Sequence, residues 1–484
     1  MNKILSRCVK IFCVAFLLPL FLFVNNVFAE AVEVSTADEL SAYFTSGGEV
    51  KLTSDITFSA NKTVKADLVL DLNGHTLNMS DKTLVVSSAA TLTIKDTSAN
   101  NDGKITSTAS FTIQIGSSTT TGKVVLESGN IDCKGSYGVR VLADSSLTVN
   151  GGKIVAKRFA IYNQSETVIN DGEVLGTNNV AIQNHNNGNL IINGGTIKTE
   201  ADYQAINMYG NCTATMNGGN IIAMKEGTEY SGQGFTMFKN TELIINGGTI
   251  TTYGPVVLGN GSGSEAGSSE GSNAKVTING GTLSSSGAGP VLYLPSRNGV
   301  HTITGGTITG PTGVEIRAGT LTVTGGTING TAAYENKENS NGGTTDGAAI
   351  SIAQHTTKQP ITVNIEGGNF NADHPISFTN PENNPPEDLA KITINITGGT
   401  YTGNNYDDLF GNLAEDQPYY RKGSSVVVGE EPEEEILVPD TGNETIASKN
   451  EAGFDVVTQI VTISTLLLLF LRPITRGAYR VVRH

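Results

Sequence analysis

The octapeptide LIINGGTI runs from Leu190 to Ile197 and returns unchanged from Leu243 to Ile250. Doublets that resemble its Gly-Gly pair recur from residue 128 to residue 399, at steps of 20 to 42 residues. A shortest step near 20 residues, with longer exceptions, indicates a fixed unit that carries loop insertions in some copies. Repeats of this length are typical of solenoids.

The residues around each doublet alternate between apolar and polar with a period of two, which is the pattern of a short β-strand. Between residues 50 and 400 no stretch shows a helical period, so leucine-rich and α-solenoid repeats are excluded. The sequence therefore predicts an all-β chain that folds as a parallel β-helix, a solenoid with about 20 residues and three short strands in each coil.

The doublet marks a sharp corner between two strands. Glycine reaches positive φ without strain, and asparagine tolerates positive φ better than most residues. Stacked coils also bring successive corners to about 4.8 Å from one another, which leaves little room for side chains. A phosphate-binding loop would need a lysine and a following helix, and the repeats have neither. The doublet is therefore interpreted as structural.

A second aligned column lies upstream of each doublet, as in Gly138–Leu142, Ala160–Gln164, Ala181–His185 and Ala205–Tyr209. Its second and fourth letters are expected to point inward. When FTMFK (Phe235–Lys239) is aligned on this column, Thr236 is the polar exception at the second letter. Asn163 and Asn184 occupy the fourth position of adjacent coils. We expect these two asparagines to be buried and to bond each other as an amide ladder.

The outward letters of the column form a candidate ligand-binding face. Its members are Arg140, Tyr162, Gln164, His185, Tyr209, Tyr293, Glu315 and Arg317. Aromatic, amide and charged groups on one flat face can bind sugars by stacking and hydrogen bonding. An ordinary solvated strand face has a similar composition, so both interpretations stay open.

Composition and charge limit the classes of partner. The chain has 57 glycines, no tryptophan and a formal net charge of −15. Three bases in residues 1–29 and a net +2 after Gly442 leave −20 on the stretch between them. A surface this acidic argues against nucleic acid or anionic lipid as a partner. Solubility outside the cell explains the acidity equally well.

Both ends of the chain carry targeting patterns. Residues 1–29 combine Lys3, Arg7 and Lys10 with an apolar run and a small-residue site at Ala29. This predicts a cleaved signal peptide, with an uncleaved anchor as the alternative. Residues 456–471 are apolar and precede a basic tail, residues 472–484. They predict one transmembrane helix with residues 30–450 outside the cell, and a buried terminal helix is the alternative.

Between these ends we expect a cap helix in residues 30–47, a β-helix in residues 48–402, a C-terminal cap in residues 403–429 and an acidic linker in residues 430–455. A capping box from Thr36 to Glu39 predicts the first cap. The low-complexity segments 260–273 and 334–346 are expected to be flexible loops. Cys133 and Cys212 are expected about 14 Å apart, at three coils of ~4.8 Å, too far for a disulfide.

Several stretches resemble one known superfamily. They are LVLDLNGHTLNM (Leu68–Met79), TIKDTSANNDGKIT (Thr93–Thr106), the recurring INGGTI and the ending ITGGTYTGNNYDDLFGNLAEDQPYY. Residues 33–428 resemble bacterial surface proteins of the pectate-lyase-like right-handed parallel β-helix superfamily, which implies a right-handed coil. That superfamily contains adhesins, phage proteins and carbohydrate enzymes alike, so the resemblance implies the fold and no particular activity.

The motif VPDTG comprises Val438, Pro439, Asp440, Thr441 and Gly442. With the later apolar run and the arginine tail it resembles a sortase sorting signal of the LPxTG type. This resemblance implies that a sortase-type transpeptidase cuts between Thr441 and Gly442 and joins the chain to the cell wall. Val438 replaces the usual leucine, and the apolar run begins 13 residues after Gly442, farther than typical. Retention in the membrane is the alternative.

Carbohydrate-active β-helices place paired carboxylates, or an arginine with calcium-binding acids, on one strand face. The outward column offers Glu315, with Arg317 two residues later, and lacks the residue set that galacturonases carry. The histidines show no metal-ligand spacing. We therefore predict no catalytic residue, no metal and no cofactor.

The sequence thus favours an exported, envelope-anchored surface protein of a bacterium, an adhesin-like or glycan-binding module without catalysis. Its partners would be a glycan or a host or neighbour-cell surface, a sortase-type transpeptidase, the cell wall and the membrane. A polysaccharide lyase or glycoside hydrolase acting on extracellular acidic polysaccharide is the alternative.

Overall fold

The computed structural model describes residues 31–228, 231–259, 273–287, 289–339, 342–355 and 358–432, with side chains left out for 337–346. The predicted signal peptide, the VPDTG motif, the apolar run 456–471 and the basic tail lie outside these residues, as do residues 260–272 and most of the linker. Among the helices that the structure describes, none has the length and apolarity needed to cross a membrane.

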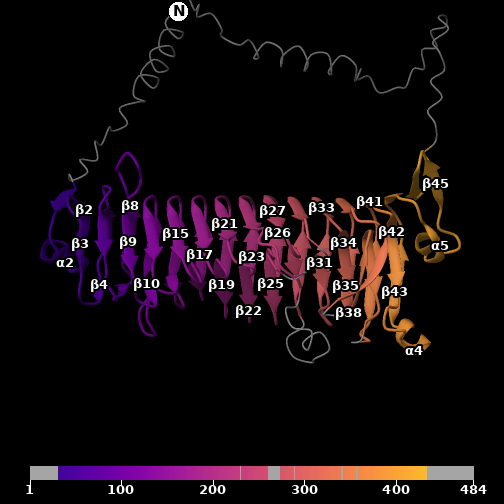
Figure 1. The fold of residues 1–484 in the computed structure, drawn as a ribbon, viewed down its shortest axis with the longest axis horizontal. Helices are drawn as coiled ribbons and strands as arrows, with labels where there is room; N and C mark the ends of the chain where they lie inside the picture. The colour runs from indigo at the N-terminus through magenta and orange to yellow at the C-terminus, as the bar shows by residue number, and fades with distance from the viewer. Residues whose placement is uncertain are drawn as a thin grey trace, which may run out of the picture. The chain divides into compact units, whose positions relative to one another are not determined.

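Three long sheets, named A, B and C here, contain nearly all the strands, and each coil contributes one strand to each sheet in that order (Figure 1). Sheet A contains β1 (Val32–Val34), β2 (Gly48–Leu52), β5 (Leu68–Asp71), β8 (Thr91–Lys95), β11 (Lys123–Leu126), β14 (Ser146–Val149), β17 (Glu166–Ile169), β20 (Asn189–Ile192), β23 (Cys212–Met216), β26 (Thr241–Ile245), β29 (Lys275–Ile278), β32 (Val300–Ile303), β35 (Gly319–Val323), β40 (Ile361–Ile365) and β43 (Ile392–Ile396). Sheet B contains β3 (Ile56–Thr57), β6 (Thr76–Asn78), β9 (Lys104–Ser107), β12 (Asn130–Cys133), β15 (Lys153–Ala156), β18 (Glu173–Gly176), β21 (Thr196–Thr199), β24 (Asn220–Ala223), β27 (Thr249–Thr252), β30 (Thr282–Ser285), β33 (Thr307–Gly310), β36 (Thr327–Gly330), β41 (Asn369–Asn371), β44 (Thr400–Thr402), β46 (Ser425–Val428) and β45 (Tyr419–Lys422). Sheet C contains β4 (Lys62–Val64), β7 (Leu84–Val86), β10 (Phe111–Ile115), β13 (Tyr137–Val141), β16 (Ile161–Asn163), β19 (Ile182–His185), β22 (Ile206–Tyr209), β25 (Phe235–Phe238), β28 (Val257–Leu258), β31 (Pro290–Leu294), β34 (Thr312–Ile316), β39 (Ala348–Ala353) and β42 (His374–Thr379).

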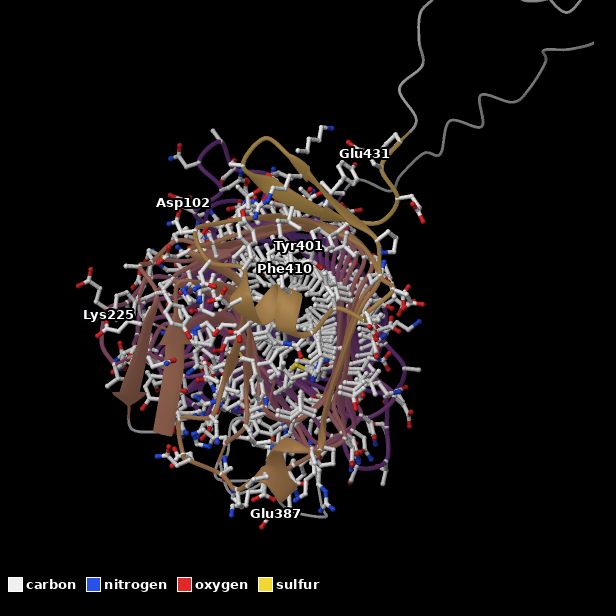
Figure 2. All side chains as sticks on the ribbon, turned by 90° about the vertical axis from the view of Figure 1, so that its right-hand side faces the viewer. Asp102, Lys225, Glu387, Tyr401, Phe410 and Glu431 are labelled. Carbon is white, nitrogen blue, oxygen red and sulfur yellow. The ribbon has the colours of Figure 1, made fainter. Side chains whose placement is uncertain are left out.

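Neighbouring strands within each sheet run parallel, except at the C-terminal end of sheet B, so the described chain is a parallel β-helix. The interior is filled by aliphatic side chains stacked in register, such as Leu190 on Ala214 and Ile197 on Ile221. Seen along the stack, carbon fills the interior and polar atoms lie at the periphery (Figure 2). Each coil buries its apolar face only against its neighbours, which is why the repeat must recur.

The opening octapeptide spans the corner between β20 and β21, and the geometry of this corner explains both of its glycines. A Cβ on Gly194 would lie 2.3 Å from the Asn170 carbonyl oxygen of the preceding coil, closer than any real contact. Gly195 adopts a φ of 73°, which side chains disfavour. A Cβ on Gly195 would also lie 2.7 Å from the Gly172 carbonyl oxygen, so the close approach is present at both positions and positive φ at the second.

The asparagine before the doublet has a different role from the expected one, because none of these corner residues adopts positive φ. Its side chain instead donates from Nδ2 to Oδ1 of the asparagine one coil earlier, over 2.8 to 2.9 Å. The exposed ladder that results contains Asn150, Asn170, Asn193, Asn217, Asn246 and Asn279. The expectation that asparagine occurs here because it tolerates positive φ was wrong. Side-chain hydrogen bonds between successive coils explain it instead.

The N-terminal end carries the helix that the capping box predicts. It is α2 (Ala37–Ser46). The Thr36 hydroxyl accepts a hydrogen bond from the Glu39 backbone N–H, and the Glu39 carboxylate accepts one from the Thr36 backbone N–H. Leu40 and Phe44 of this helix are buried against the first coil. The segment expected to hold only this cap also contributes β1, which pairs with β2 in sheet A.

The C-terminal end has two short helices, α4 (Pro386–Leu389) and α5 (Asp407–Gly411). Phe410 of α5 lies over the apolar interior in the view along the stack, and its neighbour Leu409 is fully buried (Figure 2). The hairpin of β45 and β46 closes sheet B with antiparallel pairing. An antiparallel strand interrupts the repeat, so sheet B offers no further parallel edge at this end.

Two smaller expectations have clear outcomes. The segment 334–346 contains an antiparallel hairpin, β37 (Glu335–Asn339) and β38 (Gly342–Asp346), so the expectation of a flexible loop was wrong. Cys133 and Cys212 are both free, as predicted, and both are buried. They lie in different sheets, B and A, and burial raises the pKa of the Cys212 thiol to about 12.

Candidate functional site

A continuous aromatic stack runs along the outer face of sheet C from β10 to β25. It contains Phe111, Tyr137, Phe159, Tyr162, His185, Tyr209 and Phe238. Successive ring centroids are 4.8 to 5.9 Å apart, and the His185 and Tyr209 rings are within 11° of parallel. Three of the sequence-predicted site residues lie in this stack. His185 pairs directly with Tyr209, whereas Tyr162 pairs with Gln183 and its ring contacts that of His185 diagonally.

Contacts between these rings limit how a ligand can bind to them. Three of the successive contacts are stacked, at 11 to 27° between ring planes, and three are tilted, at 31 to 49°. The stacked rings cover one another's faces, and a sugar needs a free face for stacking. The guanidinium of Arg140 further covers Phe111 and Tyr162, at 5.1 and 6.0 Å from their centroids. Arg158 and Lys239 cover other rings in the same way. The aromatic residues thus stabilise the face and hold Arg140 in place, and they offer a ligand mainly their edges.

Beside the stack lies a groove of 840 Å³ at the corner where the chain passes from sheet C to sheet A. Its lining residues are Gln114, Ser117, Ser118, Thr119, Thr120, Thr121, Arg140, Leu142, Ala143, Asp144, Gln164, Ser165, Asn186 and Asn187. The shape follows from loop length. Gly116–Gly122 and Leu142–Ser145 form long corners, whereas β16 and β17 are joined by Gln164 and Ser165 alone. The short corner is the floor. Gly116–Gly122 and Leu142–Ser145 lie on one side of it, and the corner that holds Asn186 and Asn187 lies on the other.

Two polar atoms in this groove lack hydrogen-bond partners although they are shielded from solvent: Nε of Arg140 and Oε1 of Gln164. Nδ1 of His185, the residue beyond Asn184 in the next coil, is a third such atom. Burial holds the pKa of His185 below its usual value, so the imidazole is neutral at neutral pH. A buried donor and acceptor without partners cost free energy, which a ligand could recover once the Arg140 or Gln164 side chain turns toward the groove.

The chemistry of the lining is that of a hydroxyl-binding site. Serine and threonine hydroxyls and the amides of Gln114, Gln164 and Asn187 both donate and accept hydrogen bonds. Among the lining residues Arg140 is the one base and Asp144 the one acid. Paired carboxylates, which glycoside hydrolysis uses, are not found among them.

Three predicted site residues lie elsewhere. Tyr293, Glu315 and Arg317 are 5%, 0% and 2% exposed, so the expectation that they belong to an open face was wrong. Nε of Arg317 donates to Oε1 of Glu315, and the guanidinium lies 4.8 Å from the centre of the Tyr293 ring. Tyr293 lies in β31 and Glu315 in β34, which Arg317 directly follows. Strand β34 contacts β38 of the hairpin, a covering that the repeat pattern could not indicate.

The register corrects one alignment. Phe235 pairs with Ile206 and points inward, so FTMFK begins one position later in the column than its letters suggest. Thr236 therefore faces outward from the strand, although it is only 3% exposed. From β25 onward the outer face of sheet C is covered, whereas from β10 to β22 it is partly open.

A groove with several carboxylates lies at the N-terminal end. Glu33, Glu49 and Asp71 line one groove of 780 Å³ together with Lys51 and Lys95. Lys95 bonds Glu49 at 2.6 Å, and Asp71 accepts hydrogen bonds from Thr97 and from the Asn73 backbone. Glu49 and Asp71 are therefore paired within the protein. In the described part of the chain no group of three His, Cys, Asp or Glu side chains is arranged to hold a metal ion.

Sequence reasoning found Arg140 and Gln164 but missed the rest of the groove. The signal was present in the variable number of residues between each sheet C motif and the following strand, since loop length makes the floor and the sides. In comparisons with known proteins, no family model, no curated protein and no solved structure matches the chain.

Proposed function

We propose that the chain is an exported, envelope-anchored bacterial surface protein whose β-helix binds a sugar in the groove formed by Arg140 and Gln164. The observation that carries this proposal is the pair of shielded, unpartnered polar atoms, Arg140 Nε and Gln164 Oε1, in a groove lined by hydroxyls and amides. Sugars present hydroxyls that can satisfy both a donor and an acceptor.

The finer classification is part of the same proposal. The parallel coils and the motifs quoted above support a right-handed helix of the pectate-lyase-like type. The export and anchoring parts rest on sequence pattern alone: the basic and apolar N-terminus, VPDTG, the apolar run and the arginine tail. Glu315, the carboxylate on which the enzymatic alternative depended, is buried in an ion pair, and this favours binding without catalysis.

A glycan array probed with the purified full-length chain in neutral detergent tests the binding site. We expect retention on a subset of glycans, and a loss of about tenfold or more when Arg140→Gln or Gln164→Ala removes a polar partner. Arg297→Gln is the matched control, because Arg297 is an exposed arginine in the corresponding corner between β31 and β32. Equal retention of all four proteins, or release of reducing or unsaturated sugar ends by the wild type, would contradict the proposal.

Anchoring is tested separately. Mass spectrometry of cell-wall digests should find a peptide that ends at Thr441 and is joined to wall material. Recovery of the chain only as full-length protein in the membrane fraction would refute sorting, while leaving the sugar-binding part untouched.

A further inference from the structure

The outer face of sheet B changes character at β24. Before this strand its outward positions include charged residues, among them Lys153, Glu173 and Lys198. From β24 to β44 none of the outward positions is charged. They are Asn220 and Ile222, Thr249 and Thr251, Thr282 and Ser284, Thr307 and Thr309, Thr327 and Asn329, Asn369 and Asn371, and Thr400 and Thr402. On a chain whose formal net charge is −15, seven consecutive uncharged strands form a distinct surface, called the hydroxyl face here.

The hydroxyl face is regular because strand pairing holds its side chains in two columns. Thr282 pairs with Thr307 and Thr307 with Thr327 in the first column, and the second column follows the same register. Rungs are about 4.8 Å apart along the stack, and the columns are about 7 Å apart along each strand. All of these side chains are at least partly exposed.

The second column also forms the floor of a hollow of 760 Å³. Thr309, Asn329 and Asn371 lie on its floor, and residues 330–333 and Asp373 form its sides. Asn371 donates to Asn329, and Asn329 donates to Thr309, each over 2.9 Å, so the floor is fixed.

The Asp373 carboxylate lies at the rim of this hollow, but both of its oxygens already accept hydrogen bonds from the protein. Asn404 Nδ2 donates to one oxygen over 2.6 Å and the Tyr334 backbone donates to the other over 3.0 Å. These hydrogen bonds hold the pKa of Asp373 below its usual value.

We propose that the hydroxyl face docks an uncharged, hydroxyl-bearing polymer, a neutral polysaccharide lying along the stack of coils. Threonine, serine and asparagine side chains both donate and accept, so they match sugar hydroxyls in either orientation. An acidic polysaccharide would be repelled by the net charge of the chain and would find no cation on this face to compensate its desolvation.

A second copy of the chain is a poorer fit than a polymer. Seven strands of about 13 Å, spaced by ~4.8 Å, present roughly 400 Å². Stable protein dimers bury about 800 Å² on each partner. A polymer, in contrast, repeats one weak contact on every coil, and linked weak contacts add up to useful affinity.

Affinity electrophoresis of the full-length chain in neutral detergent tests the proposal. Native gels would contain one of four neutral polysaccharides, namely hydroxyethylcellulose, galactomannan, pullulan or laminarin, or carboxymethylcellulose as the acidic match to the first. We expect retardation by at least one neutral polymer and none by carboxymethylcellulose. Thr282→Glu and Thr307→Glu should each weaken the retardation about tenfold or more, because an unpaired carboxylate would then meet the polymer.

Thr196→Glu is the matched control, since Thr196 follows the same Gly-Gly corner in β21 and lies before the hydroxyl face begins. It should leave retardation unchanged, so that a loss seen with Thr282→Glu or Thr307→Glu is assigned to the hydroxyl face. The proposal is overturned if none of the four neutral polymers retards the wild type, if carboxymethylcellulose retards it equally, or if Thr307→Glu binds like the control. A concentration-dependent dimer that Thr307→Glu dissociates, without any retardation, would assign the face to a second copy and overturn it as well.

Discussion

Asn163 donates a hydrogen bond from Nδ2 to Oδ1 of Asn184 over 2.9 Å, and both side chains are fully buried inside the β-helix, one coil apart. The bond belongs to a closed network. Thr167 donates to Oδ1 of Asn163, and Nδ2 of Asn184 donates to the Thr213 carbonyl. This is the amide ladder that the column pattern predicts, and it is confirmed.

Replacing one member of this ladder should cost more than replacing both. Asn163→Leu leaves Asn184 Oδ1 and the Thr167 hydroxyl without partners in the core, and each such group costs about 1–3 kcal/mol. In the double variant Asn163→Leu/Asn184→Leu, the pair is lost together, so the combined cost should fall below the sum of the single costs. Urea unfolding followed by far-UV circular dichroism measures this, and strict additivity would contradict a coupled ladder.

Replacing either glycine of the corner between β20 and β21 by alanine should destabilise the fold. Gly194→Ala places Cβ against the Asn170 carbonyl and should lower the free energy of unfolding by about 1–3 kcal/mol through overpacking. Gly195→Ala forces a side chain into a φ of 73°, which costs about 1–2 kcal/mol. Gly411→Ala is the control, because no atom lies within 4 Å of its Cβ position. A Gly411 variant as destabilised as the other two would show that the corner is not special.

The repeat could be predicted because every coil stacks on its neighbour in the same way, so each copy needs the same residue types at the same positions. A corner that approaches the next coil within 2.3 Å of a would-be Cβ must be glycine, and the doublet then sets the register of every inward column. The same register gave the buried Asn163 and Asn184, whereas the capping box after Thr36 gave the cap helix.

The misplaced site residues and the missed groove share one cause, which is that they depend on parts of the chain outside the regular coil. Tyr293, Glu315 and Arg317 occupy outward positions, yet additional segments cover them, and the column pattern has no information about a covering layer. The groove beside Arg140 depends on the different lengths of three neighbouring corners. The stacking of rings upon one another, which removes their faces from a ligand, follows from the coil spacing and was open to prediction.

Removing one charge of the buried ion pair between Glu315 and Arg317 should destabilise the protein. Glu315→Gln removes one charge and leaves the other in a site that is 2% exposed, which costs about 3–5 kcal/mol for buried pairs. The surface pair of Lys153 and Glu173 provides the control, since both side chains are 36% exposed. Glu173→Gln should cost less than about 1 kcal/mol. Chemical denaturation of the two variants measures the difference, and equal small losses would show that Glu315 is not held as a buried ion.

The stability of the β-helix should fall in mild acid because of His301, which lies inside the core between Val276 and Leu321. Both ring nitrogens lack hydrogen-bond partners, and burial lowers the pKa of this histidine from 6.5 to about 3. In the unfolded chain the imidazole gains a proton as the pH falls through 6.5, whereas in the folded chain it stays neutral until about 3. The unfolded state therefore binds more protons over this window, and stability, complete above the upper pKa, is lost progressively as the pH falls.

At 1.36 kcal/mol for each pKa unit, this loss is about 2 kcal/mol between pH 7 and pH 5. His301→Leu removes both the titration and the two unpartnered nitrogens, so the variant should be more stable at pH 7 and should exceed the wild type by a wider margin at pH 5. Some pH dependence should remain, because burial and the charge of Arg317 lower the pKa of His355 to about 4. Urea unfolding at both pH values decides the matter: an unchanged difference between wild type and variant would mean that His301 reaches solvent and titrates in the folded protein.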